Sequence, residues 1–324
     1  MPTTTQPQAL PKANPHPRTA AIRRRMQSTR VRAYAALALG AICIGFSAIF
    51  TKWSGIPGPV SAFYRVLIAT AALAIPYAWQ VYRQRSRERI LGIGTKRSKL
   101  TPALLGMTAL AGFFFAADLA SWNTSLQYTS AANSTLMGNL STIWVSLGAL
   151  FIFHESLKRR FWTGMAIAVA GVVIVVGRDA FEHPHLGWGD LIAVGSSLFY
   201  AGYLLTTGRT RQQMGTLTFM WLNSVAATII LAIYVFVTNQ TLTGFSADTW
   251  WSLIALGLIS HALGWLSINY SLGHLPAPLT AVTLLLQPVI TALLAVPLLG
   301  EGLSVYQIAG GLLVLLGIYT VNRR

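Results

Sequence analysis

The sequence predicts an all-α integral membrane protein with ten transmembrane helices, arranged as two inverted five-helix repeats. Three observations predict this fold class: the composition, a series of long apolar runs, and the distribution of basic residues. Of the 324 residues, 54% are hydrophobic and 10% are charged, whereas an ordinary soluble domain has about 25% charged residues. The composition therefore excludes a soluble enzyme.

Ten runs are long and apolar enough to cross a bilayer, whose hydrocarbon core is spanned by about 20 apolar residues in a helix. They lie at residues 33–52, 60–82, 101–126, 131–153, 160–177, 188–207, 216–237, 250–272, 278–299 and 303–321. The runs lack the alternating pattern of barrel strands, and a backbone in hydrocarbon must satisfy its own hydrogen bonds. Each run is therefore predicted to be a helix.

The net charge of +16 is distributed unevenly along these runs. If the N-terminus is cytoplasmic, 21 of the 24 Lys and Arg residues fall on inner segments, and the outer segments hold Lys52 and Arg178. By the positive-inside rule, both termini are predicted to be cytoplasmic in a multi-pass protein of the cytoplasmic (inner) membrane. The bases are expected to meet anionic lipid headgroups, and no nucleic-acid partner is predicted.

Residues 1–30 are rich in Pro, Thr, Gln and Arg and contain no apolar run. This composition predicts a disordered basic cytoplasmic tail. No convincing small-residue cleavage site precedes the first apolar run, so that run is predicted to remain in the mature protein. The single cysteine, Cys43, permits no intramolecular disulfide.

The chain repeats itself. A shift of 146 positions places Glu155 on Glu301, and it also superimposes residues 123–126 on residues 269–272 in three of four positions. Upstream, a shift of 158 superimposes Leu73-Ala-Ile75 on Leu231-Ala-Ile233. The repeats are predicted at 31–178 and 186–322. Because each holds five helices, an odd number, the second must cross the membrane in the opposite sense. Inverted repeats occur in many secondary transporters, whose substrate site lies near mid-membrane between the repeats.

Two Glu-containing phrases, FHESLKRRFWTGMAIAVAGVVIVVG and LLGEGLSVYQIAGGLLVLLGIY, occupy equivalent places in the two repeats. With IGFSAIFTK, FYRVLIATAAL and GHLPAPLTAVTLLLQPVITALLA, they resemble the drug/metabolite transporter superfamily in its ten-helix EamA form, over residues 33–322. One departure is His154, where the second repeat has Gly300. The resemblance implies an exporter or permease for small metabolites, often amino acids or nucleotide precursors, in the bacterial inner membrane.

Each of the two glutamates precedes the last helix of its repeat. A carboxylate there faces the positive end of the helix dipole and unpaired N–H groups, a contact that contributes about 0.3–1 kcal/mol. We interpret Glu155 and Glu301 as structural caps, with a role as coupling acids as the alternative. In the same two helices, Gly164, Gly171, Gly310 and Gly317 favour close helix packing.

Three chargeable residues lie well inside the apolar runs, away from the ends of the runs: Arg65, Asp118 and His261. A charge inside the bilayer costs at least about 2.5–3.5 kcal/mol on insertion scales, so it requires a partner or a cavity. Arg65 and Asp118 lie at similar depth and could form an ion pair, which would either fix helix packing or contact a charged substrate. The three residues are the candidates for proton coupling or gating.

Polar and aromatic residues recur at helical spacing within the runs, as in the row His261, Trp265 and Asn269. The dipeptide Gln287-Pro288 predicts a helix break, because proline frees a carbonyl of the preceding turn. Such rows indicate either a substrate cavity or hydrogen bonding between helices. The predicted substrate-binding residues are Phe46, Trp122, Asn133, Ser141, Trp144, Tyr200, Trp265, Asn269, Thr283 and Gln287.

No metal, nucleotide or nucleophile motif is present in the sequence, so neither an enzyme nor a cofactor is predicted. The sequence predicts a transporter, more specifically an exporter, of a small polar or amphipathic metabolite such as an amino acid, which works by alternating access. One alternative is an exporter of cationic drugs that relies on Asp118. The other is a lipid or scaffold membrane protein without a solute.

Overall fold

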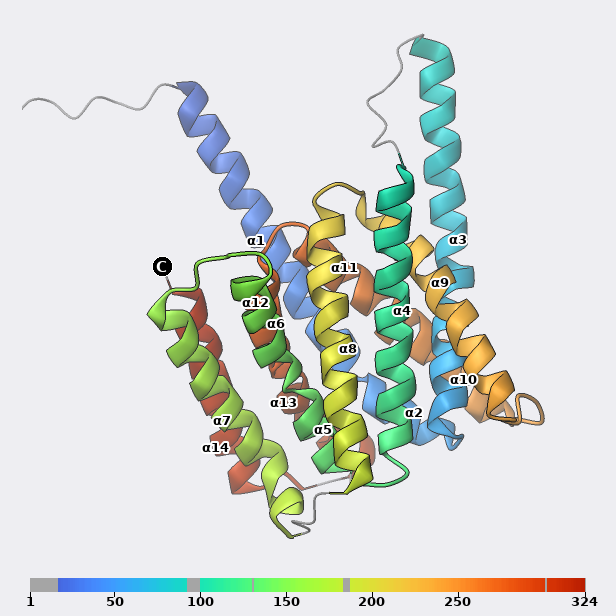
Figure 1. Cartoon of the computed structure of the whole chain (residues 1–324), viewed down its shortest axis with the longest axis vertical. Helices are drawn as coiled ribbons and strands as arrows, with labels where there is room; N and C mark the ends of the chain where they lie inside the picture. The colour runs from blue at the N-terminus through green and yellow to red at the C-terminus, as the bar shows by residue number, and fades with distance from the viewer. Residues whose placement is uncertain (1–16, 92–99, 130, 183–186, 301, 324) are drawn as a thin grey trace, which may run out of the picture.

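The structure is a computed structural model that describes residues 17–91, 100–129, 131–182, 187–300 and 302–323. These residues form helices and no strands, and the helices are gathered side by side into one bundle (Figure 1). Nine helical segments of the described chain are long and apolar enough to cross a membrane. The predicted all-helical, multi-pass membrane architecture is confirmed.

The helices follow the predicted runs in order. The first half contains α1 (Pro17–Gly45), α2 (Ser47–Ser54), α3 (Gly58–Leu91), α4 (Pro102–Ser125), α5 (Ala131–Gly138), α6 (Ser141–Phe151) and α7 (Arg159–Glu182). The second half contains α8 (Trp188–Arg211), α9 (Thr216–Val237), α10 (Ala247–Ala255), the π-helix η1 (Leu256–Trp265), α11 (Leu266–Leu272), α12 (Ala277–Leu284), α13 (Leu286–Leu299) and α14 (Val305–Asn322).

Two helices, α1 and α3, extend far beyond their predicted bounds. The helix α1 starts at Pro17, so residues 17–30 of the predicted disordered tail are helical, and residues 1–16 lie outside the described chain. The helix α3 continues to Leu91, beyond the predicted end at residue 82. Both extensions are rich in Arg and contain Gln, which are good helix formers, and proline, the first residue of α1, is well tolerated in a first helical turn.

Two of the predicted spans are interrupted at equivalent positions. The regular α-helical pattern is interrupted at Asn139 and Leu140, between α5 and α6, and again at Leu285, between α12 and α13, although Leu140 and Leu285 keep right-handed helical dihedrals. The 146-residue shift places position 139 on position 285. The second break has the predicted cause, because Pro288 cannot donate to the carbonyl of Leu284, where α12 ends. Since α5 and α6 are each too short to span, the tenth crossing at 131–153 remains a prediction.

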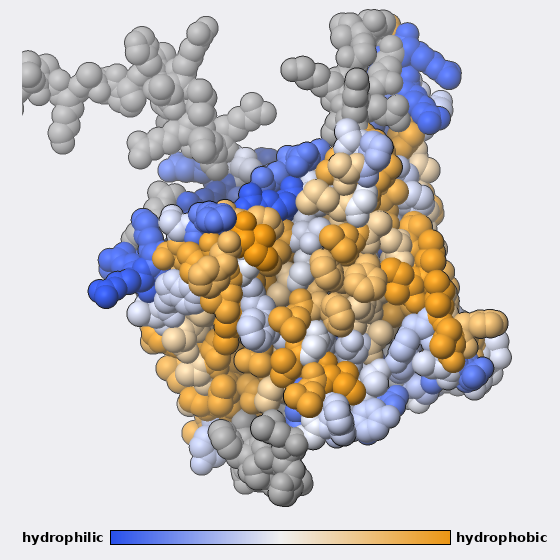
Figure 2. Space-filling view, in the orientation of Figure 1, coloured by the Kyte–Doolittle hydropathy of each residue, from blue (hydrophilic) through white to orange (hydrophobic). Residues whose placement is uncertain are grey.

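The bundle has one basic end. The first turn of α7, the last turn of α8 and the C-terminal end of α14 lie at the upper end of the bundle in Figure 1, below the long extensions of α1 and α3, with Arg159, Arg209 and Arg323 at these positions. The α2–α3 and α9–α10 connections lie at the opposite end. Figure 2 shows hydrophilic residues gathered at the basic end and hydrophobic residues over the middle of the bundle. A bilayer fits around this hydrophobic middle.

Helices that occupy equivalent places in the two halves make equivalent contacts. The helix α4 packs along α8, and its counterpart, formed by η1 and α11, packs along α1. On α3 and α9, the hydroxyls of Thr70 and Thr228 are 3.0 Å apart, and the 158-residue shift superimposes these two residues. On α7 and α14, a Cβ added to Gly171 would lie 2.7 Å from the carbonyl oxygen of Gly310. Two inverted copies would make these contacts.

Candidate functional site

The interior of the bundle holds a group of charged and aromatic side chains, which we call the central cluster. Its members come from α3, α4, α8 and η1: Arg65, Phe115, Asp118, Tyr200, Tyr203, His261 and Trp265. Phe115, Tyr203, His261 and Trp265 are buried in the structure, and so is Arg65. Three of the predicted gating residues and two of the predicted substrate-binding residues are therefore neighbours in space.

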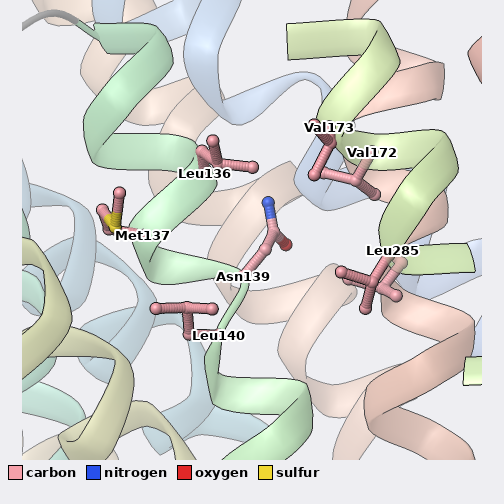
Figure 3. A pocket seen from close by; sticks show the side chains of 8 residues that line it. Leu136, Met137, Asn139, Leu140, Val172, Val173 and Leu285 are labelled. Atoms are coloured by element: carbon pink, nitrogen blue, oxygen red, sulfur yellow. The ribbon is translucent and has the colours of Figure 1, made fainter. Parts of the chain in front are cut away.

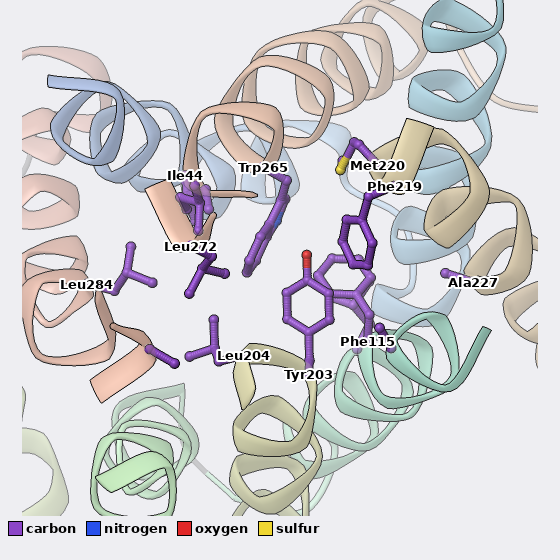
Figure 4. Close-up of a cluster of buried hydrophobic side chains, with 14 of the residues drawn as sticks. Ile44, Phe115, Tyr203, Leu204, Phe219, Met220, Ala227, Trp265, Leu272 and Leu284 are labelled. Atoms are coloured by element: carbon purple, nitrogen blue, oxygen red, sulfur yellow. The ribbon is translucent and has the colours of Figure 1, made fainter. Parts of the chain in front are cut away.

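Trp265 lies at the centre of the aromatic part of the cluster. Its ring centroid is 5.0 Å from that of Phe115 and 5.2 Å from that of Tyr203, both at edge-on angles. Tyr200 approaches the same indole edge-on at 6.0 Å. Figure 4 shows Trp265, Tyr203 and Phe115 facing one another from three helices. Such edge-to-face contacts fix the rings in a defined geometry.

His261 and Trp265 both belong to η1, the π-helical part of the crossing from Ala247 to Leu272. A π-helix is wider than an α-helix, and π-helical turns are frequent at functional sites. The imidazole of His261 is fully buried, meets the Phe115 ring edge-on at 5.3 Å, and lies 3.4 Å from the hydroxyl of Ser224. The backbone of η1 thus directs its polar side chains into the interior.

The two charges of the cluster have separate hydroxyl partners. Arg65 donates from Nη1 to Oγ of Ser47 at 3.0 Å, and Oδ1 of Asp118 accepts from Oγ of Ser196 at 2.5 Å. No ion pair joins Arg65 to Asp118, both of which the structure describes, so the possible salt bridge is not formed. The two side chains are still near enough for their charges to interact.

Several polar atoms of this region are buried without a hydrogen-bond partner in the described chain. They are Nε of Arg65, Oδ1 of Asn223, Oγ of Ser260, Nδ1 of His261 and Nε1 of Trp265. Burying such a group unpaired costs free energy, roughly 1–3 kcal/mol by mutational data. Their concentration here indicates a region built to hydrogen-bond with a polar molecule that enters it.

The other predicted contacts are distributed around the cluster. The amide of Asn269 accepts from the hydroxyl of Tyr203 at 3.0 Å, and Nε1 of Trp144 donates to Oγ of Ser197 at 3.0 Å. Asn269 and Trp144 therefore form hydrogen bonds between helices. The sequence analysis gave such bonding as the alternative to a substrate cavity.

The remaining predicted substrate-binding residues are not part of the central cluster. Phe46 stacks on Phe50 at the α1–α2 junction, and Thr283 donates to the carbonyl of Leu279 in its own helix. Ser141 is buried at the start of α6, while Trp122 in α4 and Gln287 in α13 are half-buried. The side chain of Asn133 lies outside the described residues.

Glu155 has a different contact from the predicted cap. The helix α7 begins at Arg159, and its first turn contains no acidic residue. Glu155 instead pairs with Arg209 in the last turn of α8, at 3.1 Å, and the Arg209 guanidinium lies 4.0 Å from the centroid of Phe153. Arg209 itself complements the negative C-terminal end of α8. Glu301, the second predicted cap, lies outside the described residues.

Four residues of this region were missing from the sequence-based set: Ser47, Phe115, Ser196 and Tyr203. A signal for two of them existed, because Ser196, Tyr200 and Tyr203 recur at helical spacing on one face of residues 188–207. Ser47 had no comparable signal, since a lone serine in an apolar run is common.

Comparison with known proteins places this architecture in a family. The EamA-like transporter family matches residues 31–177 and again residues 187–323. An uncharacterized transporter of Archaeoglobus fulgidus is 25% identical over 81% of this chain and 87% of its own. A probable amino-acid metabolite efflux pump of Salmonella typhimurium is 26% identical over 54% of this chain and 61% of its own.

A solved crystal structure has the same fold. It superimposes with a TM-score of 0.70 at 16% identity, and it covers 92% of this chain and 99% of its own. This likeness shows the fold. The two family matches, which cover most of the residues, show the family. The chain belongs to the EamA-like transporter family and is a multi-pass membrane transporter.

Proposed function

We propose that this transporter exports a small polar or amphipathic metabolite, such as an amino acid, and that it binds its cargo at the central cluster. The observation that carries the proposal is the set of buried, unpaired polar atoms of Arg65, His261 and Trp265 within the central cluster. An apolar solute would leave these atoms unsatisfied, whereas a polar one would pair with them.

The charges of the cluster favour a solute that carries both signs. Arg65 offers a guanidinium, which suits a carboxylate, and Asp118 offers a carboxylate, which suits an ammonium group. The two interact electrostatically but are not paired, and each is held by a serine hydroxyl. The printed name of the Salmonella relative, a probable amino-acid metabolite efflux pump, agrees with such a solute. A purely cationic drug could bind to Asp118, but the positive charge of Arg65 would then repel it.

Alternating access between the two inverted halves is the proposed mechanism. The cluster lies between helices of both halves, with α3 and α4 on one side and α8 and η1 on the other. Two inverted copies can exchange their conformations, which exposes a site between them to one face and then to the other. By the positive-inside rule, the basic end faces the cytoplasm and the membrane is the inner one.

The test is uptake of labelled solutes into inside-out vesicles that contain the purified protein, with and without a proton gradient. A panel of amino acids is compared with organic cations. We expect saturable flux of at least one amino acid, and we expect Asp118→Asn to reduce it by at least about tenfold through the loss of one charged contact. Asp248→Asn, at an exposed acid in the first turn of α10, is the matched control and should not change the flux.

The outcomes of this experiment separate the candidates. Flux of organic cations alone would favour the cationic-drug alternative. Absence of flux for every solute of the panel would contradict the proposal. If Asp118→Asn and Asp248→Asn had equal effects, the solute would bind away from the central cluster.

A further inference from the structure

A second hollow lies where the two helix breaks meet, away from the central cluster. It has a volume of about 290 Å³. The α5–α6 break contributes Asn139 and Leu140, the α12–α13 break contributes Leu285, and α7 forms a wall with Val172 and Val173 (Figure 3). No member of the central cluster lines this pocket.

The lining determines which chemistry the pocket accepts. Seven of its eight lining residues are apolar, so a charged or strongly polar molecule would lose its hydration without compensation. Asn139 is the exception. In Figure 3 its amide points into the space between Leu136, Val172 and Leu285.

Asn139 can accept one hydrogen bond from a molecule in the pocket. Its Nδ2 donates to the carbonyl oxygen of Thr135 at 2.8 Å, which fixes the orientation of the amide. Its Oδ1 accepts from no group in the described chain. A ligand with a single N–H or O–H donor would therefore complete the site.

The volume limits the size of the ligand. An apolar cavity of about 150 Å³ in another protein holds benzene, so the present pocket admits a bicyclic ring system. We propose that this pocket is a second binding site, distinct from the central cluster, for a neutral apolar molecule of about the size of indole that carries one hydrogen-bond donor.

The position of the pocket gives its occupant a role. A molecule bound there contacts both helix breaks at once. Discontinuous helices typically form the substrate region of such transporters. The occupant therefore acts as a modulator of the two breaks, and it does not need to be the transported solute.

The test uses two ring probes of similar shape, indole, which has an N–H donor, and naphthalene, which has none. Their binding to the full-length protein in lipid nanodiscs is measured by equilibrium dialysis. We expect Asn139→Leu to lower the ratio of indole affinity to naphthalene affinity about fivefold, the equivalent of one neutral hydrogen bond. Each probe partitions into the lipid equally for the two proteins, so comparing the ratio between Asn139→Leu and the unaltered protein cancels this partitioning.

A variant that fills the pocket provides the second measurement, in case Asn139→Leu folds poorly. Val173→Phe places a larger side chain in the pocket and should weaken both probes by about tenfold or more, because the space is occupied. Ala170→Phe, on the exposed face of the same helix, is the matched control and should leave both affinities unchanged.

Two results would overturn the proposal. One is an unchanged probe ratio in Asn139→Leu together with unchanged affinities in Val173→Phe. The other is the absence of saturable binding of either ring, which is expected if a phospholipid acyl chain fills the pocket.

Discussion

At the residue scale, the transporter keeps two opposite charges inside an apolar bundle by giving each one a serine partner. The sequence could predict Arg65, Asp118 and His261 as special, because an ionisable residue in an apolar run is costly and rare. It could not predict Ser47 and Ser196 as their partners. Serines are common in such runs, and which hydroxyl reaches a charge depends on the rotation of one helix against another.

The hydrogen bond between Tyr203 and Asn269 provides a test at this scale. Both residues are fully buried, and Tyr203→Phe would leave Oδ1 of Asn269 without its donor. Such bonds in membrane helices contribute about 0.6–2 kcal/mol. We expect Tyr203→Phe to lower the free energy of unfolding in mixed micelles by about 1 kcal/mol. Tyr319→Phe, at an exposed tyrosine on α14, should have no measurable effect. Equal stabilities of the two variants would argue against the bond.

At the element scale, glycines determine how closely α7 and α14 approach. The sequence predicted close helix packing for each of these helices from four glycines at helical spacing, without naming the partner, and the structure brings the two backbones into contact with each other. The break at Leu285 was also foreseeable, because Pro288 follows it. The break at Asn139 and Leu140 was not, since no proline lies there. A glycine and an asparagine in succession weaken a helix only modestly, and packing decides whether it breaks.

The contact between α7 and α14 can be tested with one methyl group. A Cβ on Gly317 would lie 2.5 Å from the backbone nitrogen of Ala168 and 2.6 Å from the carbonyl oxygen of Gly164. Backbone atoms cannot rotate away, so the helices must separate. We expect Gly317→Ala to lower the free energy of unfolding by about 1–3 kcal/mol, the usual cost of overpacking.

The matched control is Gly106→Ala in α4, where an added Cβ meets nothing within 4 Å. Alanine in a helix is favoured over glycine, so this variant should be neutral or slightly more stable. A Gly317→Ala variant as stable as Gly106→Ala would show that α7 and α14 do not pack as the structure has them.

At the scale of the whole molecule, the sequence predicted the class of protein and the order of the helices well. Composition, run length and the internal repeat each depend on sequence alone, and the two family matches at 31–177 and 187–323 lie close to the predicted repeats. The packing partners of each helix were not predictable, because lipid-facing and protein-facing surfaces are both apolar in a membrane. For this reason several predicted substrate-binding residues lie outside the central cluster.

The central claim, that the cluster opens to each side of the membrane in turn, is tested most directly by labelling a cysteine placed in it. Ser196→Cys is introduced into a Cys43→Ala background, which removes the single native cysteine. A membrane-impermeant maleimide is then applied to right-side-out and to inside-out vesicles. We predict labelling from both sides, slowed in each case by a transported solute. Labelling from one side alone under all conditions, or from neither side, would contradict the account.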